Sequence, residues 1–177
     1  MRFLAISGST RRNSTNTAML RTVSEMVEPN HSMELFDGIG DLPVFSPDIE
    51  VGTPPLAVQN FVSAIQRSDG LIISSPEYVR AIPGGLKNAI DWLVSRDEII
   101  SKPIVLMHAS HRGDDMLAQM RLVLSTVSSA FREDIFLRFP LMKKTPKEIE
   151  LYLNQPENRQ AIADFIQHLT ETFASQD

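Results

Sequence analysis

The stretch GSTRRNST at residues 8–15 combines small polar side chains with two adjacent arginines, and it directly follows the apolar stretch FLAIS. A helical pattern begins near Asn16, and a helix start presents unpaired backbone N–H groups and the positive end of the helix dipole. Hydroxyl, amide and guanidinium donors surround this helix start: Ser9, Thr10, Arg11, Ser14, Thr15 and Asn16. An arginine can form two parallel hydrogen bonds to one phosphate. The stretch is therefore either a site for a terminal phosphate dianion or a capped turn with solvated arginines.

Two better-known phosphate motifs do not describe this stretch. A Walker loop requires Gly-Lys-Ser/Thr a few residues after its first glycine, and no such sequence follows Gly8. The dinucleotide fingerprint G-x-G-x-x-G is also absent. The single G-x-G, at residues 38–40, leads into a proline-rich loop rather than a helix.

A second loop, SSPEYVRAIPGG at residues 74–85, is stiffened by two prolines and a Gly-Gly pair. Its tyrosine, Tyr78, offers a flat face and a hydroxyl group that suit the lining of a planar ring. Pro76 has no backbone N–H, whereas the amides of Glu77 and Tyr78 can donate hydrogen bonds. The Glu77 side chain is either a general base or a surface carboxylate. Trp92, on the helix that follows, is interpreted as a packing residue.

Short apolar runs and helical patterns alternate along the chain. Strands are expected at residues 3–6, 33–36, 71–73, 103–107 and 135–139, and helices near 16–27, 54–65, 86–94, 116–131 and 157–174. Pro29–Asn30 ends the first helix, Thr53 caps the second, and residues 41–55 form an ordered proline-rich loop. Apolar strands that alternate with helices predict an α/β protein with a parallel sheet covered on both faces. Five such strands suit a flavodoxin-like three-layer sandwich with strand order 2-1-3-4-5.

This topology predicts where a ligand binds. In open parallel sheets, ligands bind beyond the carboxyl ends of the strands, where the strand order reverses. For the order 2-1-3, that point lies between the first and third strands. The loops GSTRRNSTN and SSPEYVRAIPGG follow these strands, and HASHRGDD, residues 108–115, follows the fourth strand beside them. At this position the phosphate interpretation of the first loop is the stronger one.

Composition limits the classes of function. The chain has 177 residues, which predicts one domain over residues 1–177, and a net charge of −5, which argues against a broad face for nucleic acid. It contains no cysteine, so disulfides and thiolate sites are excluded. No apolar run reaches the roughly 18 residues that a membrane span needs, and the apolar N-terminal stretch is too short for a signal peptide. We therefore expect a cytoplasmic protein that binds neither membrane nor nucleic acid.

Two motifs together carry a resemblance to a known family. They are G-S-x-R-x-x-S-x-N at residues 8–16 and P-E-Y at 76–78 with P-G-G-L-K-N-A-I-D-W at 83–92. The chain resembles the NADPH-dependent FMN reductases, a family of flavodoxin-like flavin, quinone, azo-dye and chromate reductases. The resemblance implies that Ser9, Arg11, Ser14, Thr15 and Asn16 bind the FMN phosphate region. It also implies that Pro76, Glu77 and Tyr78 lie along the isoalloxazine ring.

The chain departs from the family pattern in two loops. Val79 and Ala81 replace the Asn and Ser that the family usually has after P-E-Y, so two polar side chains are missing. After the fourth strand, Asp114–Asp115 stand where the family has glycines, although Ala118–Gln119 matches its Ala-Gln pair. Ser110 and Gly113 are interpreted as contacts to the edge of the ring, and His111 is a further candidate for such a contact. The two aspartates are expected to cap the following helix.

The two histidines near the third loop are not expected to bind a metal. His108 and His111 have no third ligand at matching spacing, so no metal site is expected.

The resemblance implies that NAD(P)H transfers hydride to bound FMN, which passes electrons to a small acceptor (a quinone, azo compound, free flavin or metal oxyanion). It implies a ping-pong mechanism without a catalytic side chain. Arg80 is interpreted as a contact for NAD(P)H. Apolar surface on helices 86–94 and 116–131 favours a homodimer or homotetramer.

Two other functions remain open at the level of the sequence. The first is a flavodoxin-type FMN electron carrier without a nicotinamide site. Such carriers are often strongly acidic, whereas this chain is only mildly so. The second is a non-catalytic module that binds a phosphate ligand and has lost redox activity, which the departures at Val79, Ala81 and Asp114–Asp115 favour.

Overall fold

Five parallel strands form the centre of the molecule in the computed structural model, which describes residues 1–11, 13–27 and 31–174. Arg12 and the helix end expected at Pro29–Asn30 therefore lie outside the described residues. The strands are β1 (Arg2–Ser7), β2 (Ser32–Phe36), β3 (Gly70–Ser74), β4 (Ile104–His108) and β5 (Phe131–Arg138). They lie in the order β2-β1-β3-β4-β5, all parallel. The predicted flavodoxin-like topology is confirmed.

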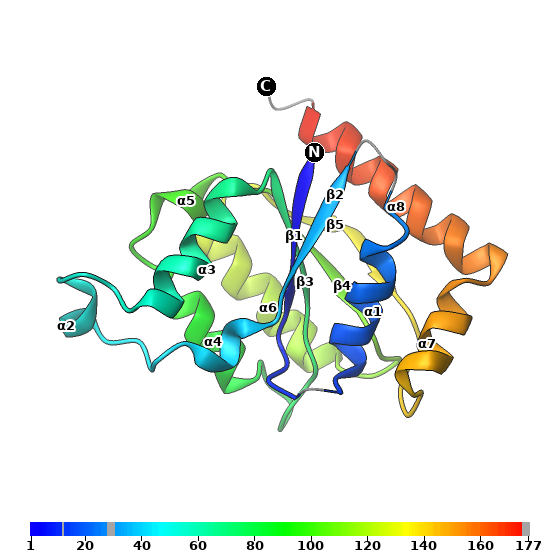
Figure 1. Cartoon of the computed structure of the whole chain (residues 1–177), viewed down its shortest axis with the longest axis horizontal. Helices are drawn as coiled ribbons and strands as arrows, with labels where there is room; N and C mark the ends of the chain where they lie inside the picture. Colours follow the sequence, from blue (N-terminus) through cyan, green and yellow to red (C-terminus); the bar gives the residue numbers. More distant parts are fainter. Residues whose placement is uncertain (12, 28–30, 175–177) are drawn as a thin grey trace.

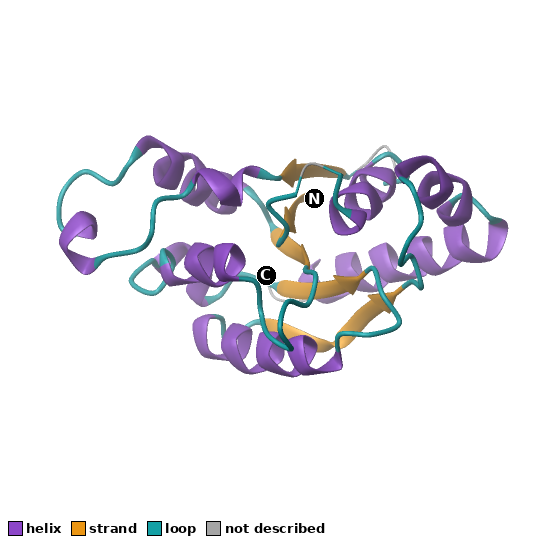
Figure 2. Ribbon diagram, turned by 90° about the horizontal axis from the view of Figure 1, so that it is seen from below, coloured by secondary structure: helices purple, strands orange, loops and turns teal. Residues whose placement is uncertain are grey.

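Helices cover both faces of this sheet (Figures 1 and 2). On one face lie α1 (Thr15–Ser24), α7 (Pro146–Leu153) and α8 (Pro156–Ala174). On the other lie η1 (Gly38–Asp41), α3 (Leu56–Arg67), α4 (Gly84–Asp91), α5 (Asp97–Ile100) and α6 (Asp114–Val127). The short helix α2 (Pro47–Glu50) projects away from these layers in both views. No helix within the described ranges is long and apolar enough to cross a membrane.

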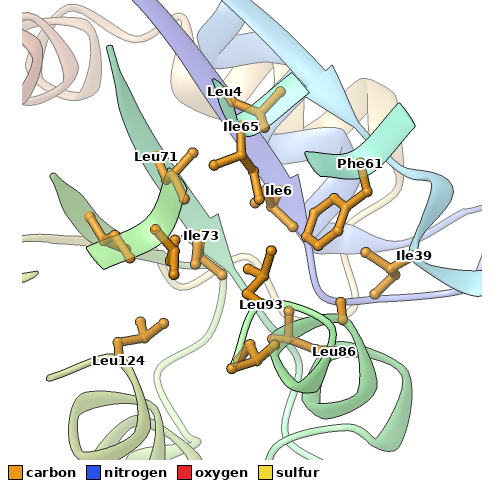
Figure 3. Close-up of a cluster of buried hydrophobic side chains, with 14 of the residues drawn as sticks. Leu4, Ile6, Ile39, Phe61, Ile65, Leu71, Ile73, Leu86, Leu93 and Leu124 are labelled. Atoms are coloured by element: carbon orange, nitrogen blue, oxygen red, sulfur yellow. The ribbon is translucent and has the colours of Figure 1, made fainter. Parts of the chain in front are cut away.

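The core consists of two apolar layers, one on each face of the sheet. Along β1, Leu4 and Ile6 belong to one layer, whereas Phe3 and Ala5 belong to the other. This alternation follows from the period of two residues in a strand, which points successive side chains to opposite faces. Figure 3 shows the first layer, where Leu4 and Ile6 of β1 lie beside Phe61 and Ile65 of α3, and Leu86 of α4 and Leu124 of α6 belong to the same cluster. Strands buried on both faces explain why their sequences are continuous apolar runs.

Several element boundaries differ from the sequence-based expectation, and some helices were not predicted. The helix expected after Thr53 begins at Leu56, with Pro55 at its N-cap and no side-chain cap. The reason is that a residue before proline avoids the helical region, so the Pro54–Pro55 pair delays the helix. The helix expected to reach residue 131 ends at Val127, and β5 begins at Phe131. Helix α7 was not predicted, although Thr145 and Glu148 form a capping box around a proline at its start.

The proline-rich loop is fastened to α4 by two side chains. Trp92 is fully buried and donates its indole N–H to the carbonyl of Pro43 at 2.7 Å. Asn88 accepts a hydrogen bond from the backbone N–H of Phe45 at 2.8 Å and donates to the same Pro43 carbonyl at 2.9 Å. The interpretation of Trp92 as a packing residue is confirmed. These bonds order the base of the loop beside the carboxyl edge of the sheet.

Candidate functional site

Three loops meet at the carboxyl edge of the sheet, which Figure 2 views from below. They follow β1, β3 and β4, and together they surround a pocket of about 270 Å³. Its lining residues are Thr15, Asn16, Ser75, Pro76, Glu77, His108, Ala109, Ser110, Arg112, Gly113 and Met142. Ligand pockets commonly hold roughly 300–1,000 Å³, so a ligand seated here would project beyond the mouth. A larger pocket of about 650 Å³ lies elsewhere, between the end of α1 and α8, and contains none of these loops.

The loop after β1 places a helix start at the edge of the sheet. Ser14 is the N-cap of α1, and the backbone N–H of Thr17 lies 3.5 Å from its Oγ, which is a long contact for a hydrogen bond. The Arg11 side chain is exposed, and its backbone N–H donates to Ser9 Oγ at 3.3 Å. The first-turn amides of α1 have no partner within the helix. The Ser14 hydroxyl, these amides and the Arg11 guanidinium are therefore available to an anion.

Buried polar contacts fix this loop against the neighbouring strand. Ser74, the last residue of β3, donates its hydroxyl to Asn16 Oδ1 at 2.8 Å. The backbone of Gly8 donates to the carbonyl of Ser74 at 2.7 Å. A Cβ at Gly8 would lie 2.7 Å from the Leu86 side chain and 3.0 Å from Cβ of Ser75, so a larger residue here would force these neighbours to shift. The loop after β1 is consequently held at a fixed distance from β3 and α4.

The loop after β3 ends in a tight turn at Tyr78–Ala81. The backbone N–H of Tyr78 donates to the carbonyl of Ala81 at 3.2 Å, and that of Ala81 donates back at 3.0 Å. The two central residues are left-handed, with φ of 52° at Val79 and 58° at Arg80. Such a turn is the I′ type, which Asn and Gly favour. Tyr78 is half-exposed and Val79 is almost fully exposed, so the turn presents both side chains to the surroundings.

The side chain of Glu77 caps the helix that follows β4. Helix α6 begins after Gly113, which has no side chain to act as a cap. Glu77 Oε2 instead accepts a hydrogen bond from the backbone N–H of Met116 at 3.1 Å. This interaction satisfies one free amide of α6 and places a carboxylate at the positive end of the helix dipole. Glu77 therefore has a fixed backbone partner on α6, which neither of the roles considered from the sequence, a general base or a surface carboxylate, had included.

The expectation that Asp114 and Asp115 cap α6 is wrong. Neither makes a capping hydrogen bond; both lie in the first turn and pair with arginines. Asp114 accepts from Arg138 at 2.8 Å, and Asp115 accepts from Arg80 at 2.5 Å. The Arg80 guanidinium holds the pKa of Asp115 below its usual range through this hydrogen bond. The carboxylates are thus neutralised by partners on neighbouring elements.

His108, at the end of β4, is a wall residue that the sequence did not identify. It is 1% exposed, and its Nε2 lies 2.5 Å from the carbonyl of Arg112, so Nε2 must carry the proton. Its Nδ1 is buried and has no hydrogen-bond partner within the described part of the chain. Burial lowers the pKa of His108, and the nearby charge of Arg138 lowers it further against the raising effects of the Arg112 carbonyl and Asp114. The imidazole is accordingly neutral at pH 7.

We expect His108 to make the stability of the protein fall under mildly acidic conditions. Its pKa is lower in the folded chain than in the unfolded chain, where it is about 6.5, so protons bind preferentially to the unfolded state. The free energy of unfolding should therefore fall as pH drops below about 6.5, by at most roughly 1.4 kcal/mol per pH unit. Urea unfolding at pH 7.5, 6.5 and 5.5 measures this, and His108→Gln should flatten the profile. Parallel profiles of stability against pH in the two proteins would show that His108 does not cause the loss of stability at acidic pH.

The structure brings only part of the predicted site into one pocket. Thr15, Asn16, Pro76, Glu77, Ser110 and Gly113 line it. Ser9 and Arg11 line a separate hollow, Ser14 lies on a third, and Tyr78 and Arg80 lie on the projecting turn. Ser75, His108, Ala109, Arg112 and Met142 were missed. Ser75 and His108 sit at the carboxyl ends of strands and could have been found from that position, whereas nothing in the sequence marks Met142.

No cluster of three or more histidine, aspartate or glutamate side chains suited to a metal ion occurs among the described residues. His108 and His111 lie near each other in sequence but differ in environment, because His108 is buried and His111 is exposed.

Comparison with known proteins bears on the same segments. The sequence model of the NADPH-dependent FMN reductases matches residues 1–137, which include all three loops. The chain belongs to this family. Figure 1 shows that the matched region ends in β5, so that α7 and α8 lie outside it. The family is one of flavoenzymes that use FMN and NADPH.

Several curated relatives share this region. A quinone reductase of Pseudomonas putida is 41% identical over 86 residues, which cover 49% of the chain and 46% of the relative. A probable NADPH:quinone oxidoreductase of Oryza sativa is 43% identical over 96 residues, covering 52% and 47%. An NAD(P)H-dependent FMN reductase of Pseudomonas aeruginosa is 39% identical over 113 residues, covering 62% and 60%. The chain spans about half the length of the first two relatives.

Solved structures support the fold. FerB, a flavoenzyme NAD(P)H:(acceptor) oxidoreductase from Paracoccus denitrificans, is 22% identical with a TM-score of 0.69, covering 98% of the chain and 95% of FerB. Oxidised flavodoxin 1 from Bacillus cereus is 17% identical with a TM-score of 0.58, covering 95% and 98%. At these identities the likeness establishes the flavodoxin-like fold.

The residues of the site fit FMN. The donors after β1 can bind a phosphate: they are the first-turn amides of α1, the Ser14 hydroxyl and the exposed Arg11 side chain. A pocket at the same edge of the sheet is lined by Pro76, by residues of two loops and by the buried His108 side chain. An elongated ligand with a phosphate at one end matches this arrangement.

Proposed function

We propose that the chain is an NAD(P)H-dependent FMN oxidoreductase that reduces a small acceptor (a quinone, azo compound, free flavin or metal oxyanion). One observation carries this proposal: Thr15 and Asn16 at the start of α1 and Pro76 and Glu77 of the loop after β3 line a single pocket at the carboxyl edge of the sheet. Family membership and the names of the curated relatives support it. Bound FMN supplies the redox chemistry, since it accepts hydride and passes electrons on.

The side chains in this proposal bind and orient rather than react. Ser9, Arg11, Ser14, Thr15 and Asn16 hold the phosphate region, and Pro76, Glu77 and Tyr78 support one side of the ring. Ser110 and Gly113 meet its edge. Glu77 acts through its bond to the Met116 amide, because this bond joins the ring-supporting loop to α6. Orientation of two reactants in one site can itself lower a barrier by about 7–11 kcal/mol in favourable cases.

A ping-pong scheme follows if the nicotinamide and the acceptor use the same exposed place in turn. Anaerobic addition of NADPH to the FMN-loaded protein tests the first half, and bleaching of the visible flavin bands is the expected result. Parallel double-reciprocal plots with a quinone acceptor test the second half. FMN that binds but is not bleached by either nicotinamide would indicate an electron carrier. A colourless protein that fails to bind FMN would indicate a module without redox activity.

Arg80 is proposed as a contact for a phosphate of NAD(P)H. Its side chain is 82% exposed and pairs with Asp115, and an exposed ion pair is worth about 1 kcal/mol or less, so a phosphate can displace the aspartate. We expect Arg80→Ala to raise the KM for NADPH about three- to tenfold with little change in kcat. Arg67→Ala, an equal change of charge on α3, is the matched control. An unchanged KM for NADPH and for NADH would remove Arg80 from the site.

We also propose an oligomeric state and a location for the protein. Most apolar side chains of α4 and α6 are buried in the core of the chain, and those exposed include Val94, just after α4, and Leu122. Val44 and Val51 are also exposed, on the projecting proline-rich loop. These residues support a homodimer or homotetramer, which light scattering during gel filtration would measure. We further propose that residues 1–177 act as one FMN-binding domain in the cytoplasm.

A further inference from the structure

The turn at Tyr78–Ala81 adopts a conformation that its own residues disfavour. Both central residues are left-handed, and a β-branched residue such as Val79 rarely adopts a positive φ. Val79 is 98% exposed, so no packing of its side chain compensates for this conformation. Residues in such regions persist only where the surrounding structure holds them. Something outside the turn must therefore stabilise it.

The carboxamide of Gln119 on α6 joins both sides of this turn. Its Nε2 donates to the carbonyl of Arg80 at 2.9 Å, and its Oε1 accepts from the backbone N–H of Ile82 at 3.4 Å. One side chain thus bonds a carbonyl within the turn and makes a longer contact with an amide just beyond it. Two further contacts join the same segments: Glu77 to the amide of Met116, and Arg80 to Asp115. Gln119 is the member of this set that binds the backbone of the left-handed residues.

We propose that Gln119 is a positioning residue, which holds the Tyr78–Ala81 turn in its left-handed form and so presents Tyr78 to the ring. The Arg80–Asp115 pair does not suffice, because it joins two exposed side chains and leaves the backbone free to relax. A carboxamide that both donates and accepts is the group that this pair of backbone atoms requires. The inference that Gln119 orients Tyr78 toward the flavin ring rests on the proposed function, whereas the inference that Gln119 holds the turn does not.

The test compares Gln119→Met, which keeps the length of the side chain but removes the donor and the acceptor, with the unaltered protein. Hydrogen exchange without flavin reads the turn directly through the amides of Tyr78 and Ala81, both of which donate within it. We expect these two amides to exchange roughly two- to tenfold faster in the variant, the range that corresponds to one net hydrogen bond. The Kd for FMN, measured by quenching of flavin fluorescence, should rise by a similar factor.

A second variant separates the conformation of the turn from other effects. Val79→Gly removes the cost of a positive φ without adding a polar group. In the Gln119→Met background it should restore slow exchange at Ala81 and most of the FMN affinity. Asparagine would be less informative, because its amide could itself contact flavin. Gln167→Met is the matched control, since Gln167 lies on α8 and bonds only to Glu171 and Thr170 among the contacts described.

The outcomes are distinct. Unchanged exchange at Tyr78 and Ala81 in Gln119→Met would overturn the proposal, as would a failure of Val79→Gly to restore it. If exchange also accelerates throughout β1 and β3, the substitution has destabilised the whole fold and a positioning role is refuted. If the unaltered protein binds no FMN, the proposed function fails, while the exchange data still decide whether Gln119 holds the turn.

Discussion

Replacing Arg11 and Ser14 together with alanine is expected to weaken FMN binding by about two orders of magnitude or more. Hydrogen bonds to a charged group each contribute roughly 1.5–3 kcal/mol, and every 1.4 kcal/mol is a factor of ten in affinity. Arg11 is exposed, so its removal should leave stability almost unchanged. Ser14 is the N-cap of α1, and its loss should also lower the free energy of unfolding by about 1 kcal/mol. Fluorescence titration with FMN measures the affinity.

Two control variants separate phosphate binding from these side effects. Arg67→Ala removes the same charge from the last turn of α3, outside the hollows on which Arg11 and Ser14 lie. Thr145→Ala removes the N-cap of α7, so it should cost similar stability with no effect on FMN. Intact flavin affinity in the double variant, at a temperature where it is folded, would show that the phosphate does not bind at this helix start. The proposed function depends on that site.

The fold was predictable because the strands follow local rules. Residues such as Phe3–Ile6 and Leu71–Ile73 are buried on both faces, so they form continuous apolar runs that a sequence displays directly. The order of alternating strands and helices then leaves few right-handed topologies. Helix α7 was missed because its eight residues lack a long apolar stripe, although the capping box at Thr145 marks its start.

The candidate site was predictable to the level of its loops. The switch point of the sheet depends only on strand order, and it correctly placed the loops after β1, β3 and β4 around one pocket. The partners of individual side chains were not predictable, because they depend on distances between segments. Glu77 is separated from Met116 by 39 positions, and its role as a cap follows from the absence of a side chain at Gly113. No local pattern reveals such a pairing.

The same reasoning explains the two departures from the family pattern. Val79 replaces an asparagine that a left-handed position favours, and nothing in the linear sequence shows that the position is left-handed. Asp115 looked like a helix cap because acidic residues are common in a first turn, yet its partner is Arg80 on another loop. In both cases the backbone conformation of Tyr78–Ala81 decides the role of the residue. That conformation depends on α6 as well as on the turn.

Gly113→Ala is expected to have the largest effect on stability of the variants considered, about 2–4 kcal/mol of unfolding free energy. Gly113 has a φ of 104°, a conformation that residues with a side chain rarely adopt. An added Cβ would also lie 2.8 Å from Nε2 of His108, the atom that bonds to the Arg112 carbonyl. The substitution therefore strains the backbone and displaces a buried histidine. Urea unfolding with and without FMN measures both consequences.

The two causes of this loss can be separated by a double-mutant cycle with His108→Ala. If crowding of the imidazole contributes, the two substitutions together should cost less than the sum of their single effects, with a coupling energy of about 0.5–3 kcal/mol. If backbone strain alone is responsible, the effects should add. Gly52→Ala is the control, because a Cβ there meets no atom within 4 Å and no positive φ is involved. A loss below about 0.5 kcal/mol for Gly113→Ala would mean that the loop after β4 relaxes freely, and that Gly113 does not define the wall of the pocket.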